Sequence, residues 1–526
     1  MIEAILPPSI LATCVSFHEA IAEKGLMKAI ADRAAEHAAE RAVVGIGIRK
    51  YSPEVLATVS GIRMFGVPVE VLYYVPVFTT LAIAFYKYWS FVIDDDALVP
   101  VKKRKWLRAI VLAFAGVFMF EVLVEPTSFL PVSEPLFRPS CAPTRKSNFL
   151  AIRANRMAPL KHRWSLGHNY LAGITLGDWV RLLRENDFAV DPVYWHRAAF
   201  ITMASLMNSA YRRKEERLFN DKVAEVKVAA PLFVIGHWRT GTTHLHNLLA
   251  QDSAQFACAN TYQVVNPHTF LCTEEQNARR FAWLVPSKRP MDNVAMSFQS
   301  PQEDEFAPCL MSLRSLYLGI SFARREDHYD RYLTFRGVPE EDVEAWKTAF
   351  VWFLMKLTFK YNRPLVLKSP PHTARIRLLL EMFPDARFVH IHRNPYTVFQ
   401  SFRHYFDTAM WHTYLQKPDV QRIDERIVQR YNRLYDAFFE ERGLISAGRF
   451  HEVGFDQLER DPLGEMRRLY EGLNLPGFEA FRPKLQSYVD SLAAYRKNEF
   501  GDLESGWRSK IAREWQRSFE EWHYPT

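Results

Sequence analysis

The fold is decided by the stretch Pro231-Leu232-Phe233-Val234-Ile235-Gly236-His237-Trp238-Arg239-Thr240-Gly241-Thr242-Thr243-His244-Leu245. Its apolar run 232–235 has the composition of a buried strand, and residues 244–250 have the apolar spacing of a helix. In a strand, loop and helix of this kind, backbone N–H groups point into one concavity, where the helix dipole adds positive potential. The stretch therefore predicts a phosphate-binding loop, with a strand-to-helix turn that binds no ligand as the plainer alternative.

The spacing of Gly236 and Gly241 equals that of the nucleotide-binding P-loop, Gly-x-x-x-x-Gly-Lys-[Ser/Thr]. Thr242 stands in the lysine position, while Arg239 supplies a cation three residues after the first glycine. The nearest predicted strand ends in His392-Arg393 rather than in the aspartate that usually holds Mg²⁺. These differences favour an anionic nucleotide without a metal-bridged triphosphate. A kinase with a degenerate P-loop is the alternative enzyme class.

Further runs of strand type follow at 364–368, 387–391 and 450–453, and helical patterns separate them. The helix after the run 387–391 opens with Asn394-Pro395, an N-cap residue followed by proline at the first helical position. Strands that alternate with helices imply a mostly parallel sheet with ligands at the carboxyl ends of the strands. We therefore expect an α/β fold, with a P-loop NTPase-like parallel sheet flanked by helices.

Three predicted strand ends carry polar residues suited to one anion-rich ligand. The first is the loop 236–243, the second is Lys368-Ser369-Pro370-Pro371-His372, and the third is Arg393, followed eight residues later by Ser401. This set resembles the sulfotransferases that use 3′-phosphoadenosine-5′-phosphosulfate (PAPS), in particular their broad "RSGTT" subgroup of bacterial and Golgi-type members. The resemblance covers residues 226–526, and the loop together with Arg393 and Ser401 carries it.

The resemblance implies roles for individual residues. Arg239 and the residues after it would bind the 5′-phosphosulfate of PAPS, the full set being Arg239, Thr240, Gly241, Thr242 and Thr243. Arg393 and Ser401 would hold the 3′-phosphate, with the arginine as a charge-assisted fork. Lys368 would face the sulfuryl group. Arg496 and Lys497 lie where many members of the family place a basic loop on the 3′-phosphate, without the glycines of that loop.

Sulfuryl transfer also needs a base for the proton of the acceptor. Fixed cations and N–H donors can stabilise the charge that develops on the leaving phosphate, so no metal is expected. Glu303 is the first candidate for the base and Glu305 the second, because clustered buried carboxylates raise the proton affinity of at least one of them. His372 is the runner-up, although Pro370-Pro371 separate it from the lysine. The alternatives are an acidic first turn of a helix and an ordinary histidine at a helix start.

The part of the chain before the loop predicts a membrane anchor. Residues 71–86 carry no charge, and the apolar character resumes after Lys87 as far as residue 93, while residues 109–120 form a second apolar stretch. Together they predict a hairpin of two membrane helices, in a Golgi-type or a bacterial inner membrane, with the topology undecided. The expected organisation is an N-terminal helical segment (1–65), two membrane helices (66–125), a linker and helical lead-in (126–225) and a sulfotransferase domain (226–526).

The expected function is metal-independent, base-assisted transfer of a sulfuryl group from PAPS to a hydroxyl or amine. A net charge of +8 over 526 residues suits anionic ligands, and no block of Lys and Arg is long enough to indicate nucleic-acid binding. The sequence leaves the acceptor open among small molecules, glycans and lipids. Besides the kinase, a non-catalytic membrane-anchored nucleotide-binding module remains an alternative.

Overall fold

The structure is a computed structural model that describes residues 63–64, 67–68, 160–162, 165–166, 169–280, 289, 291–292, 294, 296–493, 497–498 and 500–526. The chain divides into two compact units, residues 1–147 and 148–526. In the first unit the described residues form a short antiparallel pair, β1 (Arg63–Met64) with β2 (Val67–Pro68). All further elements within the described residues belong to the second unit.

The second unit is built on a five-stranded parallel sheet with the order β4-β5-β3-β6-β7. The strands are β3 (Leu232–Ile235), β4 (Ala257–Cys258), β5 (Leu365–Lys368), β6 (Arg387–His392) and β7 (Phe450–Gly454). β3, the first of these strands along the chain, lies in the middle, between β5 and β6. The carboxyl ends of β3, β5 and β6 therefore meet at one edge, as the sequence predicts for an α/β fold of this type.

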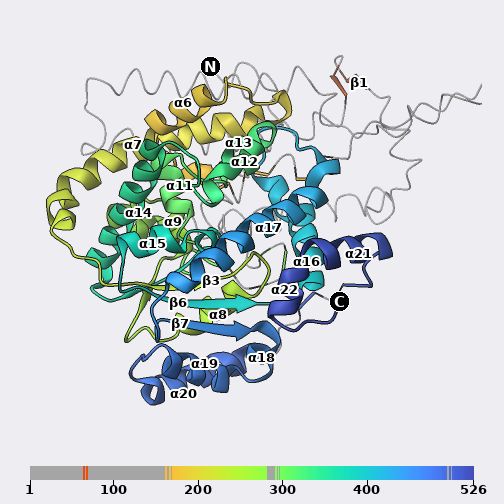
Figure 1. The fold of residues 1–526 in the computed structure, drawn as a ribbon. Coiled ribbons are helices and arrows are strands. Elements are labelled where there is room, and N and C mark those ends of the chain that lie inside the picture. Colours follow the sequence, from red (N-terminus) through yellow and green to blue (C-terminus); the bar gives the residue numbers. More distant parts are fainter. Residues whose placement is uncertain are drawn as a thin grey trace, which may run out of the picture. The chain divides into compact units, whose positions relative to one another are not determined.

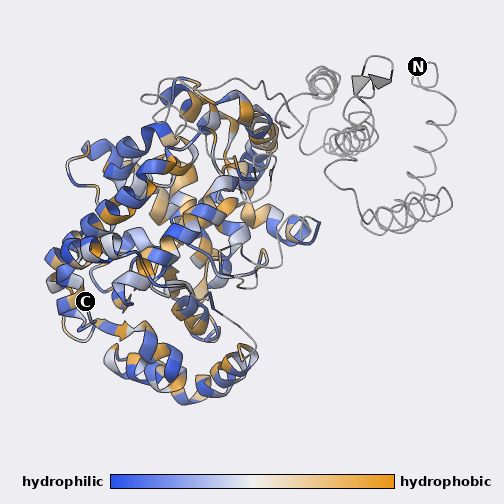
Figure 2. Cartoon of the chain, turned by 90° about the vertical axis from the view of Figure 1, so that its right-hand side faces the viewer, coloured by the Kyte–Doolittle hydropathy of each residue, from blue (hydrophilic) through white to orange (hydrophobic). Residues whose placement is uncertain are grey.

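Alternate side chains of the strands enter two hydrophobic cores, one on each face of the sheet. Phe233 and Ile235 of β3 point into the larger core, and Leu232 and Val234 point into the smaller one. In Figure 1, α18, α19 and α20 gather beyond β7, while α17 lies on the opposite side of the sheet. Figure 2 shows hydrophobic and hydrophilic residues alternating along most helices, as expected of helices that bury one face.

The helices that cover the sheet have the following bounds: α6 (Leu176–Glu185), α7 (Trp195–Ala224), α8 (Thr242–Leu249), α9 (Thr261–Val265), α10 (Phe270–Arg280), α11 (Phe306–Ser312), α12 (Leu318–Ser321), α13 (Glu326–Tyr329), α14 (Glu340–Tyr361), α15 (Ile376–Met382), α16 (Pro395–Thr408), α17 (Ile423–Glu441), α18 (Phe455–Arg460), α19 (Pro462–Gly472), α20 (Phe478–Ser491), α21 (Ser505–Glu514) and α22 (Gln516–Glu521). A 3₁₀ helix, Pro370–Ala374, follows β5. The predicted cap of α16 is confirmed, because the Asn394 side chain accepts a hydrogen bond from Tyr396 N at 3.0 Å.

The region between α8 and β5 differs most from expectation. The apolar runs of the sequence predict no strand there, whereas the structure has the edge strand β4 together with helices α9 to α14. The longest of these, α14, buries residues around much of its circumference, so its apolar residues do not follow one face. Its ends do carry helix signals, with Glu340 and Glu341 in the first turn and Lys360 in the last, which complement the helix dipole.

The predicted membrane localisation is corrected by the structure. No helix in the described part of the chain is long and apolar enough to cross a bilayer. The two stretches 71–93 and 109–120, from which the multi-pass hairpin was predicted, lie outside the described residues, as do residues 1–62 and the proline-rich stretch 126–143.

Candidate active site

The loop between β3 and α8 has the backbone conformation of a phosphate-binding loop. Gly236 has a φ of 146° and Gly241 a φ of 103°, which residues with a side chain rarely adopt. A Cβ atom on Gly236 would lie 2.5 Å from the carbonyl oxygen of Ile391, and one on Gly241 would lie 2.3 Å from the ring of Phe455. Both glycines are therefore needed for space as well as for conformation. α8 begins directly after them, so its first N–H groups face the loop.

Arg239 connects this loop with α16. Its backbone is in the left-handed region, with a φ of 72°. Its Nε donates a hydrogen bond to Ser401 Oγ at 3.0 Å, and its Nη1 lies 2.9 Å from Oδ2 of Asp292. The centre of the Tyr405 ring is 6.0 Å from the guanidinium carbon. The structure thus brings together Arg239 and Ser401, which the sequence placed at two different strand ends.

Arg393, directly after β6, is a second cation beside the loop. Its guanidinium carbon lies 4.2 Å from the centre of the Phe455 ring, and its Nη1 is 3.4 Å from the carbonyl oxygen of Arg239. Burial lowers the pKa of Arg393, and the nearby carboxylate of Asp456 opposes this effect. A guanidinium stacked on an aromatic ring in this way keeps its fork of N–H donors oriented for a phosphate.

The carboxylate of Glu303 is held in place by two partners at the end of β5. Its Oε1 lies 2.9 Å from Lys368 Nζ, and its Oε2 accepts a hydrogen bond from the hydroxyl of Tyr317. Burial lowers the pKa of Lys368, while the charge of Glu303 partly offsets this effect. Burial and the same carboxylate raise the pKa of Tyr317, which therefore remains a donor at neutral pH. Trp238 Nε1 completes the chain by donating to the Tyr317 oxygen at 3.3 Å.

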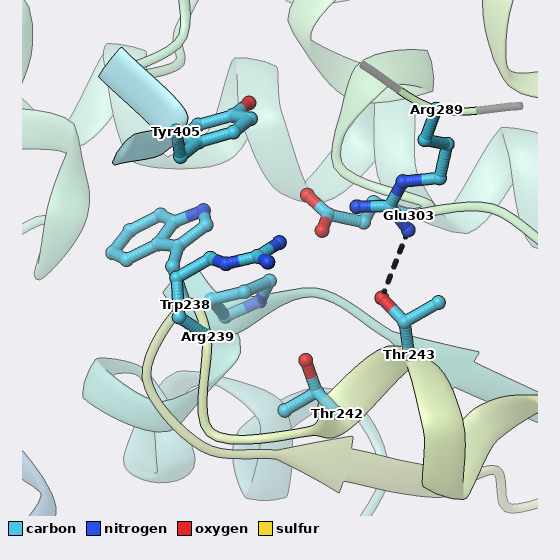
Figure 3. A pocket seen from close by; sticks show the side chains of 8 residues that line it. Trp238, Arg239, Thr242, Thr243, Arg289, Glu303 and Tyr405 are labelled. Atoms are coloured by element: carbon cyan, nitrogen blue, oxygen red, sulfur yellow. Dashed lines mark hydrogen bonds between the residues drawn. The ribbon is translucent and has the colours of Figure 1, made fainter. Parts of the chain in front are cut away.

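Several of these groups line one hollow above the loop. Its lining consists of Trp238, Arg239, Thr242, Thr243, Arg289, Glu303, Pro370 and Tyr405. Figure 3 shows Arg239 and Arg289 reaching into this hollow from opposite sides, with Thr242 and Thr243 beneath them and Glu303 behind. Arg289 Nη1 lies 3.4 Å from Thr243 Oγ1. Two guanidinium groups and a helix N-terminus thus line the hollow together with the fixed carboxylate of Glu303, an arrangement that suits an anion next to a basic group.

The sequence matches a family model with the description "Sulfotransferase family" over residues 231–480. It is also 37% identical, over 354 residues, to the omega-hydroxy-beta-dihydromenaquinone-9 sulfotransferase Stf3 of Mycobacterium tuberculosis, an alignment that covers 67% of this chain and 90% of the relative. This chain belongs to the sulfotransferase family. The Stf3 protein of Mycobacterium bovis matches over the same length with the same identity. Among solved structures, sulfotransferase STF9 from Mycobacterium avium aligns with a TM-score of 0.49 and 18% identity, covering 66% of this chain and 96% of that one.

In this sulfotransferase the residues predicted to bind the donor divide into two groups. Arg239, Thr242 and Thr243 line the hollow. Thr240 is buried, and its hydroxyl donates to the carbonyl oxygen of His237 at 2.8 Å, so its side chain stabilises the loop itself. Gly241 provides the conformation that precedes α8.

The basic residues predicted near the C-terminus lie differently. Lys497 is exposed and forms an ion pair of 2.6 Å with Glu459 of α18. Arg496 lies outside the described residues. A contact between either residue and the nucleotide stays a prediction.

The acidic residues 303–305 of this sulfotransferase lie in three different environments. That of Glu305 does not fit its predicted role as a base. Glu305 is fully buried and forms hydrogen-bonded ion pairs of 2.8 and 3.1 Å with Arg375. It also accepts hydrogen bonds from Ser315 at 2.7 Å and from Trp346 at 3.3 Å. All four lone-pair positions of its carboxylate are used by hydrogen bonds within the core. Glu305 is therefore not available to take a proton from the substrate that receives the sulfuryl group.

His372 requires the same correction. Its side chain has no exposed surface, and its Nε2 lies 2.5 Å from Oδ2 of Asp304, which is itself buried. Burial alone would raise the pKa of Asp304, but the charge and the hydrogen bond of His372 outweigh it and lower the pKa. The pair is enclosed by aromatic rings, among them Phe233 and Phe350. His372 is therefore the partner of Asp304, a residue that sequence reasoning left without a role.

Sequence reasoning missed two residues of the site: Arg289 and Tyr317. Tyr405 also lines the hollow, and it stands four residues after Ser401 and therefore on the same face of α16. Tyr317 and Arg289 follow no strand and no periodic pattern, and only the folded chain brings them to the hollow.

Proposed function

We propose that this sulfotransferase moves the sulfuryl group of PAPS to a hydroxyl group, or to an amine, of its acceptor. The 5′-phosphosulfate would lie on the loop, against Thr242, Thr243 and the first N–H groups of α8. The 3′-phosphate would lie against Arg393 and Ser401. The hydrogen bond between Arg239 and Ser401 supports this placement, because it joins the two anion-binding regions within one short distance.

The observation that carries the proposal is the position of Glu303. Its carboxylate lines the same hollow as Thr242, Thr243 and Arg239, and it is the acidic member of that lining among the described residues. A hydroxyl group between Glu303 and the loop could pass its proton to this carboxylate while its oxygen attacks the sulfur. Lys368, paired with Glu303 and at the end of β5, adds positive charge where negative charge develops.

For the acceptor we propose an alcohol on a largely apolar molecule. The relative that matches 67% of this chain is named for its action on omega-hydroxy-beta-dihydromenaquinone-9. Trp238 and Tyr405 give the hollow two aromatic walls, against which an apolar body can pack. The proposal keeps two predictions made from the sequence. Transfer is expected to need no metal, and a linker and helical lead-in (126–225) is expected to precede the sulfotransferase domain (226–526).

Two measurements test the proposal, the first for the donor and the second for the acceptor. Calorimetric titration in EDTA compares 3′-phosphoadenosine-5′-phosphate (PAP) with ADP, and we expect PAP to bind about tenfold tighter or more, because the 3′-phosphate forms charge-assisted hydrogen bonds. Transfer of radioactive sulfate from PAPS is then measured to a menaquinone-derived alcohol, a sugar and a tyrosine peptide.

The Arg393→Ala variant should lose PAP binding and transfer. Arg279→Ala is the matched control, since Arg279 is an exposed arginine at the end of α10 whose side chain is 80% exposed. Equal binding of ADP and PAP, or full transfer by Arg393→Ala, would contradict the proposed donor site. Transfer to the sugar or the peptide alone would contradict the proposed acceptor, and loss of transfer in EDTA would contradict its independence from metal.

A further inference from the structure

A second acidic residue, Asp292, lies at the rim of the hollow and joins its two arginines. Oδ2 of Asp292 is 2.9 Å from Arg239 Nη1 and 3.4 Å from Arg289 Nη2. All three side chains are largely buried, with exposed fractions between 13% and 18%. The carboxylate thus neutralises part of the positive charge that faces the loop.

Arg289 occupies a particular place between the two ends of the site. Its Nη1 contacts the hydroxyl of Thr243 in the first turn of α8, and it lines the hollow beside Glu303. Figure 3 shows its guanidinium pointing from the far side of the hollow toward Thr243, opposite Arg239. A group between the loop and Glu303 would lie in the hollow that this guanidinium lines.

The charges at this point compete with one another. A phosphosulfate on the loop would meet Arg239 and Arg289 at the positions where the Asp292 carboxylate now meets them. Like charges within about 4 Å repel strongly in a partly buried site. Binding of the donor and the contacts of Asp292 therefore exclude each other in part.

We propose that Arg289 is a further catalytic residue, which contacts the sulfuryl group during transfer, and that Asp292 competes with the donor for Arg289 and Arg239. The inference rests on the proposed function. In the step concerned, the bond between sulfur and the phosphate oxygen breaks, and its electron pair stays on the phosphate of PAP. The acceptor oxygen forms the new bond to sulfur, and its proton passes to Glu303. Arg289 stabilises the negative charge on the sulfuryl oxygens during this exchange.

Two variants test this proposal, one through the affinity for PAP and the other through kcat. Asp292→Asn removes the competing charge, so PAP should bind about tenfold tighter, as measured by calorimetry. Arg289→Gln removes the contact with the sulfuryl group, so kcat with PAPS should fall about 100-fold, in the range seen when one donor to a developing charge is removed. The dissociation constant of PAP, which has no sulfuryl group, should change much less in Arg289→Gln.

An exposed ion pair elsewhere provides the matched controls. Glu275 and Arg279 of α10 form an ion pair of 3.2 Å on the surface, with exposed fractions of 86% and 80%. Glu275→Gln and Arg279→Gln change the net charge by the same amounts as the two test variants, and both should leave PAP binding and kcat unchanged. Circular dichroism and thermal unfolding check that every variant is folded.

The outcomes separate this inference from the proposed function. If the unmodified protein binds PAP but Asp292→Asn binds it no tighter, or if Arg289→Gln keeps its kcat, the inference is overturned and the proposed function stands. If the unmodified protein binds no PAP, both are overturned. If Asp292→Asn does not fold, the kcat of Arg289→Gln decides alone.

Discussion

Glu303 and Glu305 stand two residues apart in one short segment, yet they belong to two different regions of the molecule. Glu303 faces the hollow, with Lys368 and the Tyr317 hydroxyl as its partners. Glu305 faces the core between α11 and α14, where Arg375, Ser315 and Trp346 surround it. Under the proposed function, the same side-chain type serves chemistry in one region and structure in the other. The difference lies in what surrounds the carboxylate: Glu303 retains a side open to the hollow, and Glu305 has none.

The largest effect expected from this comparison is on turnover by Glu303→Gln. Glutamine keeps the shape of the side chain but cannot accept the acceptor's proton, so kcat should fall by about 10²- to 10⁴-fold. The variant also takes the charge partner from buried Lys368, but stability should fall less than in Glu305→Gln, because the Glu303 side chain is partly exposed and that of Glu305 is not. Steady-state kinetics with PAPS measures kcat, and differential scanning calorimetry measures thermal unfolding. Near-normal turnover in Glu303→Gln would rule out this residue as the base.

The opposite pattern is expected for Glu305→Gln. The substitution leaves the buried charge of Arg375 without its partner, which costs about 3–5 kcal/mol of unfolding free energy. Urea unfolding followed by circular dichroism measures this loss. The fraction of molecules that stays folded at low temperature should turn over at a rate close to that of the unmodified protein. A stable Glu305→Gln protein with strongly reduced kcat would reverse the assignment of the two carboxylates.

Asp304, between the two, should control stability through pH. Its pKa lies below its ordinary value of 3.8, so its contribution to stability is present above that pH and is lost as the pH falls through the pKa of the folded state. Asp304→Asn should therefore destabilise the protein at neutral pH. The difference in unfolding free energy between the two proteins should shrink below about pH 4. Urea titrations at a series of pH values test this, and a difference that grows toward acid pH would show that the pair with His372 is misread.

The smallest effect is expected for Tyr317→Phe. The variant removes one hydrogen bond to Glu303 and one acceptor for Trp238, and leaves the ring in place. A loss of about 0.5–1.5 kcal/mol per hydrogen bond corresponds to a roughly threefold to tenfold fall in kcat. Ser315→Ala is the matched control, since it removes one hydrogen bond from Glu305 instead. If both variants lowered kcat equally, the separation between the two regions would not hold.

Sequence reasoning recovered the sheet and the loop, because both depend on local patterns. The runs of β3, β5, β6 and β7 are short and bounded by turn residues, and the structure places each within one residue of its predicted end. Gly236 and Gly241 were recognisable because only a few spacings of glycine fit a phosphate-binding loop. Edge strand β4 and helix α14 were missed, since two residues are too few for a strand pattern and a helix buried on several sides loses its period.

By itself, the sequence determined that the chain carries a parallel sheet with a glycine-containing loop between its first long strand and the following helix, and it indicated the sulfotransferase family. The tertiary structure decided which of the candidate residues can act together. The sequence offered Glu303, Glu305 and His372, in this order, as candidate bases, and packing placed the first at the hollow and the other two in the core. Arg289 and Asp292 reach the loop only through contacts between residues about 50 positions apart in the chain. The physical reason is that local backbone preference acts over a few residues, whereas burial and charge pairing are set by the whole fold.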